Sequence, residues 1–344
     1  MKRIKILLSV ILFIVSIGAT SGQNLSIHGN QFYADGKVFP MWGLRAASAT
    51  QNERNTDQLI SVLDEYKKHG LNAVSVYLQG SSGGYSDPFQ HGGKQLSEDH
   101  LKRLERIIEQ CQNHSMVVIV GIFYQRTLAS DSIRNLHSKR DIFNAVKTLT
   151  KALKGHENVI INIANEQNSF YYQKFTPFSF NEAKNIIKLC KRVKRFDKNR
   201  IVGAGGYNDS LNVLIGKSRH VDVLLFDTYS GDVEKNQHSG WHYDYFRKMG
   251  VPDKPMINVE MFGGWTGQFV PPGVYTEEGK KLHTQEIEEA LKRPGLHVHL
   301  HSNVWMQGPS EGYPTRYDLA GRGTEEDPGI RWWFDHLKNS LTKE

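Results

Sequence analysis

Two glutamates that follow separate apolar runs are the residues in this sequence best suited to acid–base chemistry. The run 159–164 is followed by Asn165 and Glu166, and the run 256–259 is followed by Glu260. Short runs rich in Val and Ile, bounded by polar residues, glycine or proline, are typical of buried strands. Two carboxylates that are far apart in sequence and brought together by the fold are what hydrolysis of a glycosidic bond requires.

The chemistry of such a pair sets conditions on its geometry. In the retaining form of the reaction, the two carboxyl groups lie about 5 Å apart. One attacks the anomeric carbon, while the other protonates the leaving oxygen and then activates water. Their pKa values must differ, so their surroundings must differ as well. The ends of a fourth and a seventh strand would face each other across the mouth of a barrel, which suits this separation.

The elements that must position the pair alternate between strand-like and helix-like segments. The predicted strands are 39–44, 71–78, 116–124, 159–164, 201–204, 221–226, 256–259 and 296–305. The predicted helices are 56–69, one capped by Ser97, 142–153, one that starts at a capping box formed by Ser179 and Glu182, 211–215, 243–249, 277–292 capped by Thr276, and 330–341. This alternation predicts a (β/α)8 TIM barrel that forms a single domain over residues 23–344. Active sites of such barrels lie at the C-terminal ends of the strands.

Four long loops follow predicted strands and would wall that face of the barrel. They span 79–96, 125–139, 165–178 and 262–276, and their aromatic residues include Tyr85, Phe89, Phe170, Tyr171, Tyr172, Phe175 and Trp265. Aromatic side chains on such loops suit ligands with flat apolar faces, such as sugars.

The two glutamates and their strands resemble clan A of the glycoside hydrolases, and family 5 in particular. In that clan an Asn-Glu pair ends the fourth strand and a Glu ends the seventh, as Asn165, Glu166 and Glu260 do here. The resemblance implies that Glu166 is the acid/base and Glu260 the nucleophile, and that Asn165 holds the sugar hydroxyl beside the reacting carbon. It further implies a β-linked oligo- or polysaccharide substrate, with no metal and no organic cofactor.

The resemblance also suggests sugar contacts outside the pair. Trp305, near the end of the eighth predicted strand, matches a common sugar platform, and Tyr229, after the sixth, matches a tyrosine that commonly hydrogen-bonds the nucleophile. Further candidates stand at strand ends or just after them, where sugar contact and loop packing are both open: Tyr77, Tyr124, Gln125, Trp265 and Gln307.

Three positions depart from the pattern of family 5. The segment 72–77 has no Arg where the family has one near the second strand, and Arg45, after the first strand, is a candidate to supply that charge. The usual His of the third strand is missing from 120–124. The usual His-x-Tyr after the sixth strand is here Asp227-Thr228-Tyr229. These departures favour a divergent member of family 5 or a sister family.

Two other classes of function stay open. His297, His299 and His301 alternate with apolar residues, so their imidazoles share one face of a strand, where a His-x-His pair can chelate a metal. A metal-dependent TIM-barrel hydrolase is therefore one alternative, although no matching Asp/His set stands at the other strand ends. A barrel that binds glycans without cleaving them is the other, although a binding protein has no need of both carboxylates.

The first 22 residues have the pattern of a secretory signal peptide. Lys2, Arg3 and Lys5 precede the apolar run 6–17, and small residues follow at 18–22. We therefore expect an exported protein, in the periplasm, at the cell surface or in the medium. No strong second apolar stretch follows, so no membrane span is expected in the mature chain.

Charge and cysteine content exclude some classes of partner and give no indication of oligomeric state. Part of the net charge of +7 comes from the signal segment, and no dense Lys/Arg stripe with interleaved aromatics is present, which argues against nucleic acid. Cys111 and Cys190 fall on the apolar faces of predicted helices and are expected to be buried free thiols.

Overall fold

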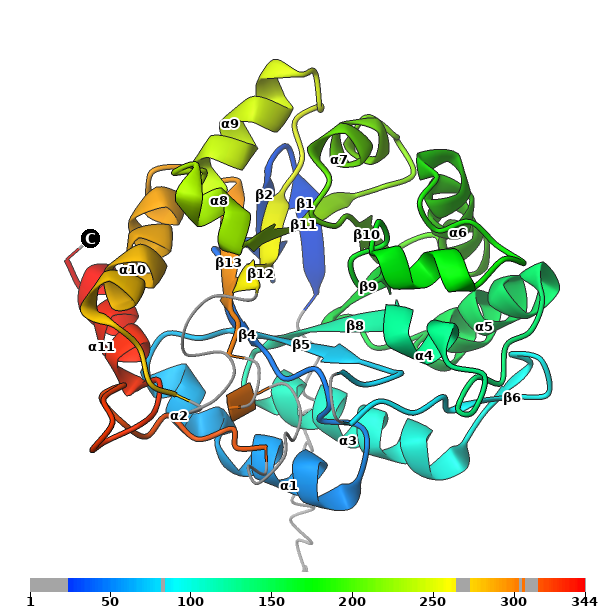
Figure 1. The fold of residues 1–344 in the computed structure, drawn as a ribbon, viewed down its shortest axis with the longest axis horizontal. Helices are drawn as coiled ribbons and strands as arrows, with labels where there is room; N and C mark the ends of the chain where they lie inside the picture. Colours follow the sequence, from blue (N-terminus) through cyan, green and yellow to red (C-terminus); the bar gives the residue numbers. More distant parts are fainter. Residues whose placement is uncertain (1–23, 82–83, 264–272, 303–304, 307–314, 344) are drawn as a thin grey trace, which may run out of the picture.

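The fold is a closed barrel of parallel strands surrounded by helices (Figure 1). The computed structural model describes residues 24–81, 84–263, 273–302, 305–306 and 315–343. The strand order around the barrel is β10-β11-β12-β13-β4-β5-β8-β9. This confirms the predicted (β/α)8 barrel.

Eight strands form the barrel, each overlapping one of the predicted ranges. They are β4 (Trp42–Arg45), β5 (Ala73–Tyr77), β8 (Val117–Phe123), β9 (Val159–Ala164), β10 (Ile201–Ala204), β11 (Val223–Tyr229), β12 (Met256–Gly263) and β13 (Leu296–Leu300). β11 and β12 run past their predicted ends because they stay paired beyond a shift in their register. Phe226 pairs with Asn258, but Asp227 pairs with Glu260, so the register shifts between these positions. Such a bulge redirects the side chains that follow it.

The helices largely fill the predicted ranges. They are α1 (Glu53–Ser61), α2 (Leu63–Lys68), α3 (Glu98–Asn113), α4 (Gln125–Ala129), α5 (Lys139–Ala152), η1 (Phe170–Lys174), α6 (Ala183–Phe196), α7 (Asp209–Gly216), α8 (Ser230–Glu234), α9 (Ser239–Lys248), α10 (Glu277–Leu291) and α11 (Arg331–Leu341). The predicted helix 56–69 is two helices that meet at Val62. The short elements α4, η1 and α8 lie in loops after strands and were not predicted.

The three predicted helix caps have different outcomes. Ser97 is the N-cap residue of α3 but makes no side-chain capping hydrogen bond. Thr276 caps α10 as expected, since its hydroxyl accepts a hydrogen bond from the Gly279 N–H at 3.0 Å. The predicted capping box of Ser179 and Glu182 is wrong. Glu182 is itself the N-cap residue of α6 and makes no side-chain capping hydrogen bond, while its carboxylate pairs with Lys184 instead.

Apolar side chains fill the N-terminal end of the barrel, beneath the active-site end. An antiparallel sheet of β1 (Leu25–His28), β2 (Gln31–Ala34) and β3 (Lys37–Val38) was not predicted from the sequence. Its Leu25 and Phe32 share one apolar cluster with the first residues of barrel strands. A second small hairpin joins β6 (Phe89–Gln90) to β7 (Gln95–Leu96).

Two barrel glycines make room for large interior side chains. A Cβ atom at Gly43 would overlap the imidazole of His299, and one at Gly121 would overlap the ring of Tyr77. Glycine in a strand often marks such a close approach. The Tyr77 ring therefore lies across β8 inside the barrel, just below the mouth.

Two further expectations concern cysteines and membranes. Cys111 and Cys190 are buried and free, as predicted. None of the helices within the described ranges has the length and apolar character needed to cross a membrane. The proposed signal segment 1–22 lies outside the described residues.

Candidate active site

Glu260 lies near the end of β12 and is 7% exposed. Its Oε2 forms an ion pair with Nη1 of Arg45, which ends β4. Its Oε1 lies 3.4 Å from Nδ1 of His301. Arg45 is itself buried, and its guanidinium stands 4.8 Å from the centroid of the Tyr77 ring. The fixed cation offsets the cost of burying the Glu260 carboxylate.

The backbone on both sides of Glu260 is held by buried polar side chains. Asn258 accepts a hydrogen bond from the Glu260 N–H at 3.2 Å. Its amide donates to the hydroxyls of Thr228 at 2.9 Å and Ser239 at 2.7 Å. The Thr228 hydroxyl also accepts from the Phe262 N–H at 3.0 Å. β11 and α9 therefore fix the position of Glu260 from outside its own strand.

Glu166 follows β9 and has a positive φ of 44°, a region that non-glycine residues seldom occupy. Backbone strain of this kind concentrates at functional sites. Gln125 donates a hydrogen bond to Oε2 of Glu166, and Asn165 donates to the same oxygen at 3.1 Å. Burial raises the pKa of Glu166 above its ordinary value, against the opposing effects of Arg45, Arg126 and the two amides.

Asn165 and Gln125 form one hydrogen-bonded unit with Glu166. The Asn165 amide donates to Oε1 of Gln125 at 3.0 Å, and the Tyr172 hydroxyl donates to the Asn165 carbonyl at 2.9 Å. The Asn165 N–H donates to the Phe123 carbonyl at 2.9 Å, which ties this turn to β8. Gln125, which the sequence left open between sugar contact and packing, is a direct partner of Glu166.

Tyr77 and Tyr124 line the neighbouring wall of the barrel mouth. Their ring centroids are 6.3 Å apart, and both residues are buried. Asn162 donates a hydrogen bond to the Tyr77 hydroxyl at 3.4 Å. Burial raises the pKa of Tyr77 to about 12 against the lowering effect of Arg45, so its hydroxyl keeps its proton at neutral pH.

One site residue was not selected from the sequence. Asp227, near the end of β11, is 4% exposed and pairs in register with Glu260. Burial raises its pKa to about 8; the charge of Glu166 contributes to the rise, and Arg45 opposes it. The signal that could have found it is the departure from His-x-Tyr, because it put a carboxyl where the family has an imidazole.

The two aromatic residues assigned by resemblance occupy unexpected surroundings. Tyr229 is 39% exposed, and its ring lies 5.9 Å from that of Tyr207. Among the described residues no hydrogen bond joins Tyr229 to Glu260, so the predicted contact is not formed. The register shift after Asp227 accounts for this, because it changes the side-chain alternation of β11.

Trp305 is buried at 2% exposure. Its indole N–H donates to the Asp318 carbonyl at 2.9 Å, and the guanidinium of Arg316 lies 4.3 Å from a ring centroid of the indole. The ring is not open to a sugar in this conformation, so its role as a platform stays a prediction. Trp265 and Gln307 lie outside the described residues.

The three histidines of β13 and its end share one face of the strand, as the alternation predicts. That face is the barrel interior, but the three have separate partners. Met41 N–H donates to His297 Nδ1 at 3.1 Å, and Ser75 Oγ lies 2.9 Å from His299 Nδ1. Burial lowers the pKa of both imidazoles to about 3. Within the described part of the chain, no group of three His, Cys, Asp or Glu could hold a metal. Among the described residues, the histidine run therefore lacks the further ligands that a metal-dependent hydrolase would need.

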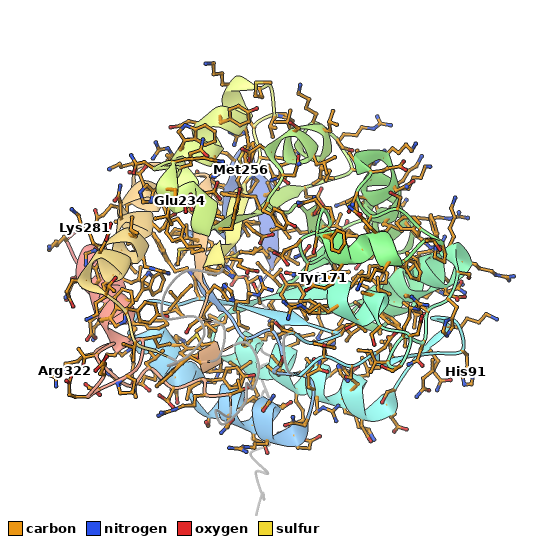
Figure 2. The ribbon with its side chains drawn as sticks, viewed as in Figure 1. His91, Tyr171, Glu234, Met256, Lys281 and Arg322 are labelled. Atoms are coloured by element: carbon orange, nitrogen blue, oxygen red, sulfur yellow. The ribbon has the colours of Figure 1, made fainter. Side chains whose placement is uncertain are left out.

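Exposed aromatic side chains flank the Glu166 side of the mouth. Phe170 and Tyr171 on η1 are 64% and 38% exposed, Tyr229 ends β11 at 39% exposed, and half-buried Tyr207 follows β10. Figure 2 places Tyr171 toward the middle of the ring of helices, whereas His91 and Arg322 lie at its rim. We call Phe170, Tyr171, Tyr207 and Tyr229 the aromatic rim. Their faces suit the apolar faces of sugar rings.

Comparisons with known proteins agree with this architecture. Residues 32–244 match the family described as cellulase (glycosyl hydrolase family 5). A search of curated proteins finds no match. An endo-1,4-beta-mannanase from Rhizomucor miehei has a similar structure, with a TM-score of 0.63 at 14% identity, over 93% of this chain and 100% of the mannanase.

Two further solved structures are similar at comparable levels. A beta-glucanase from Saccharophagus degradans gives a TM-score of 0.62 at 13% identity, over 94% of each chain. A family 5 glycoside hydrolase from Bacteroides vulgatus gives a TM-score of 0.64 at 14% identity, over 92% of this chain and 68% of that one. At these identities the likeness concerns the fold.

Proposed function

The chain belongs to family 5 of the glycosyl hydrolases, and we propose that it cleaves a β-linked glycan with net retention of configuration. Glu260 is the nucleophile and Glu166 the acid/base in this proposal. One observation carries it: the two glutamates at the C-terminal ends of β9 and β12 have different surroundings, since half-buried Glu166 accepts hydrogen bonds from neutral amides and buried Glu260 forms an ion pair with Arg45. Different environments are what assign different roles to two carboxyls.

In the first step a Glu260 oxygen attacks the anomeric carbon, and the bond from that carbon to the leaving oxygen breaks. The proton of Glu166 passes to the leaving oxygen. The raised pKa of Glu166 favours the protonated form that this step requires. Arg45 keeps its partner carboxylate anionic and fixed in direction before attack.

In the second step water attacks the anomeric carbon of the glycosyl ester, and Glu166, now an anion, takes its proton. Glu260 leaves as a carboxylate and returns to Arg45. Two inversions give net retention. Asn165 is proposed to donate to the sugar hydroxyl beside the reacting carbon, since its amide already stands at the Glu166 carboxylate.

We propose a β-mannan or β-glucan as the substrate class. Support comes from the mannanase and the glucanase that share this fold. The aromatic rim adds ring faces beyond the catalytic pair, on the loops that follow β9 and β10 and at the end of β11. Such faces favour an oligomeric substrate over a single sugar.

The direct test is a screen of purified protein against β-mannans, β-glucans and aryl β-glycosides, with release of reducing ends as the readout. We expect release from at least one glycan. Binding on a glycan array without release from any member of the panel would favour the glycan-binding barrel instead.

Replacing Arg45 with methionine should lower kcat by about 100-fold or more, because a buried carboxylate that loses its cation takes up a proton. Removing one partner of a buried ion pair typically costs about 3–5 kcal/mol, and protonation of Glu260 relieves that cost. The nucleophile would then ionise only at higher pH, so the acid limb of the kcat profile should move upward in pH. The measurement is kcat between about pH 4 and 9, a range that spans the ordinary carboxyl pKa and a strongly raised one.

Arg200→Met is the matched control for that variant. Arg200 is also a buried arginine, but it donates to the backbone carbonyls of His156, Val159 and Leu153, away from the catalytic pair. It should lower stability and leave the acid limb in place. An unmoved acid limb in Arg45→Met would contradict the role given to Arg45.

We also propose that the enzyme acts outside the cytoplasm, on the strength of the N-terminal pattern of residues 1–22. N-terminal sequencing of the protein from its native cells tests this. Cleavage near residues 20–22 is expected, and an intact Met1 would contradict it.

A further inference from the structure

We propose that Asp227 is a third carboxyl of the active site, whose charge acts on Glu166 and sets the pH range over which Glu166 can donate. This inference rests on the proposed function, in which Glu166 is the acid/base. Asp227 acts through Glu166 and is therefore a positioning residue.

The first support is the position of Asp227 in the barrel. It stands near the C-terminal end of β11, in register with Glu260 on β12, and its N–H donates to the Gly206 carbonyl at 3.1 Å. The residue is buried at 4% exposure. Its carboxyl interacts electrostatically with Glu166 and Arg45, so it belongs to the same cluster of charges.

The second support is the lack of a structural partner for the side chain. Oδ1 of Asp227 is buried and has no hydrogen-bond partner among the described residues. Neighbouring aspartates are used structurally: Asp232 accepts from the Tyr229 N–H at 2.9 Å, and Asp209 pairs with His242 at 3.0 Å. An unpartnered buried polar atom in a cleft needs an explanation, and a role toward a ligand or a proton provides one.

The third support is the charge balance around the pair. Arg45, which reaches both Glu166 and Asp227 electrostatically, is engaged in an ion pair with Glu260. The charged and titratable groups that face the pair from the surrounding elements are Arg45 on β4, Tyr77 on β5, Tyr124 and Arg126 at the start of α4, Tyr172 on η1, Tyr207 after β10, Glu260 on β12 and His301 after β13.

Two carboxyls that interact electrostatically, while Arg45 is engaged by Glu260, do not both ionise readily. They titrate as a pair, and the last proton leaves at a higher pH than it would from Glu166 alone. That proton passes to the leaving oxygen as the glycosidic bond breaks and the ester to Glu260 forms. In the second step the proton from water returns to the pair, so each turnover leaves its proton count unchanged.

The test with substrate is Asp227→Asn, which keeps the shape and removes the second acid. The basic limb of kcat/KM should move to lower pH by about one unit or more, because no second carboxylate then opposes ionisation of Glu166. At pH values below that limb, kcat/KM should stay within about tenfold of the wild type. Asparagine keeps the shape of aspartate, so the variant changes at most one hydrogen bond there, and such a change typically costs no more than about tenfold. A basic limb that coincides with that of the wild type would overturn the proposal.

Asp222→Asn is the matched control. Asp222 lies just before β11, at the opposite end of the barrel, where it pairs with Lys194 and accepts from the Val202 N–H at 2.9 Å. The Asp222→Asn substitution removes one negative charge beside the same strand, β11, but away from Glu166. A shift of the basic limb as large in Asp222→Asn as in Asp227→Asn would show a general charge effect and would also overturn the proposal.

A second readout needs no substrate. Between its unfolded and folded pKa values, native Asp227 holds a proton that the unfolded chain has released, so rising pH favours unfolding. The unfolding equilibrium constant of the wild type, divided by that of Asp227→Asn, should therefore increase by up to about tenfold per pH unit between about pH 5 and 7. A ratio that stays constant over this range would overturn the proposal even if hydrolysis is found. A rising ratio with no hydrolysis would uphold the protonated state of buried Asp227 and count against the proposed function alone.

Discussion

Replacing Glu260 with alanine is expected to lower kcat by at least about four orders of magnitude, because the glycosyl ester can no longer form. The loss should appear on every substrate, since the nucleophile is needed whatever the leaving group. The measurement is kcat on the glycan identified by the screen, with circular dichroism to verify the fold. Glu289→Ala is a matched control, because Glu289 is also paired with an arginine, Arg293, but on the outer helix α10.

Azide provides a sharper test of the same variant. A small anion can occupy the space left by the missing carboxylate and attack the anomeric carbon of an activated aryl glycoside. We expect azide to raise the rate of Glu260→Ala and to give a glycosyl azide of the configuration opposite to that of the substrate. Retention of more than about a hundredth of the wild-type kcat, together with no response to azide, would contradict the assignment.

Replacing Glu166 with glutamine should lower kcat/KM on a polysaccharide by about 100- to 10,000-fold, the range expected for a lost general acid. The loss should be much smaller on aryl glycosides with acidic phenols, because such leaving groups depart without a proton. The measurement is kcat/KM over a series of aryl glycosides that differ in the pKa of the phenol. An equal loss across the series would show that Glu166 does not protonate the leaving oxygen.

The pH dependence of the same variant adds an independent outcome. Glu166 has a raised pKa in the folded protein, so the wild-type kcat/KM should fall only as pH rises through that raised value. Glutamine has no proton to lose there, so this basic limb should disappear in Glu166→Gln. Glu182→Gln, at a glutamate that pairs with Lys184 before α6, should keep the limb.

The barrel and the placement of Glu166 and Glu260 at its mouth were accessible from the sequence because both depend on local pattern. The apolar run before Glu166 is β9 with the predicted bounds, and the run before Glu260 starts β12 where expected. Since parallel strands of a barrel all end at the same face, the order of the runs was enough to bring the two glutamates to one mouth. Arg45 was a candidate for the active-site cation on other grounds, because the segment 72–77 lacks the Arg that family 5 has there, and it pairs with Glu260.

The parts that could not be predicted depend on contacts between distant segments. The register shift at Asp227 arises from how β11 pairs with β12, and it leaves Tyr229 beside Tyr207 and without a hydrogen bond to Glu260 among the described residues. Single-sequence periodicity carries no information about such a shift. The short helix α4, which supplies Gln125 to Glu166, has too few residues to show a period.

The N-terminal sheet of β1, β2 and β3 could not be predicted for the same reason. Its strands are short, and their apolar residues alternate over only two or three positions, which is too few to distinguish them from a loop. What makes them strands is pairing with one another and packing of Leu25 and Phe32 beneath the barrel. This tertiary contact is the reason for the local structure.

The measurement that tests the central claim most directly is covalent trapping of the nucleophile. A 2-deoxy-2-fluoro glycoside of the sugar identified by the screen, with an activated leaving group, should form the ester rapidly and release it slowly. Digestion and mass spectrometry are predicted to place the added mass on the peptide that carries Glu260. Label on Glu166 or Asp227, or no label together with a product of inverted anomeric configuration, would contradict the account.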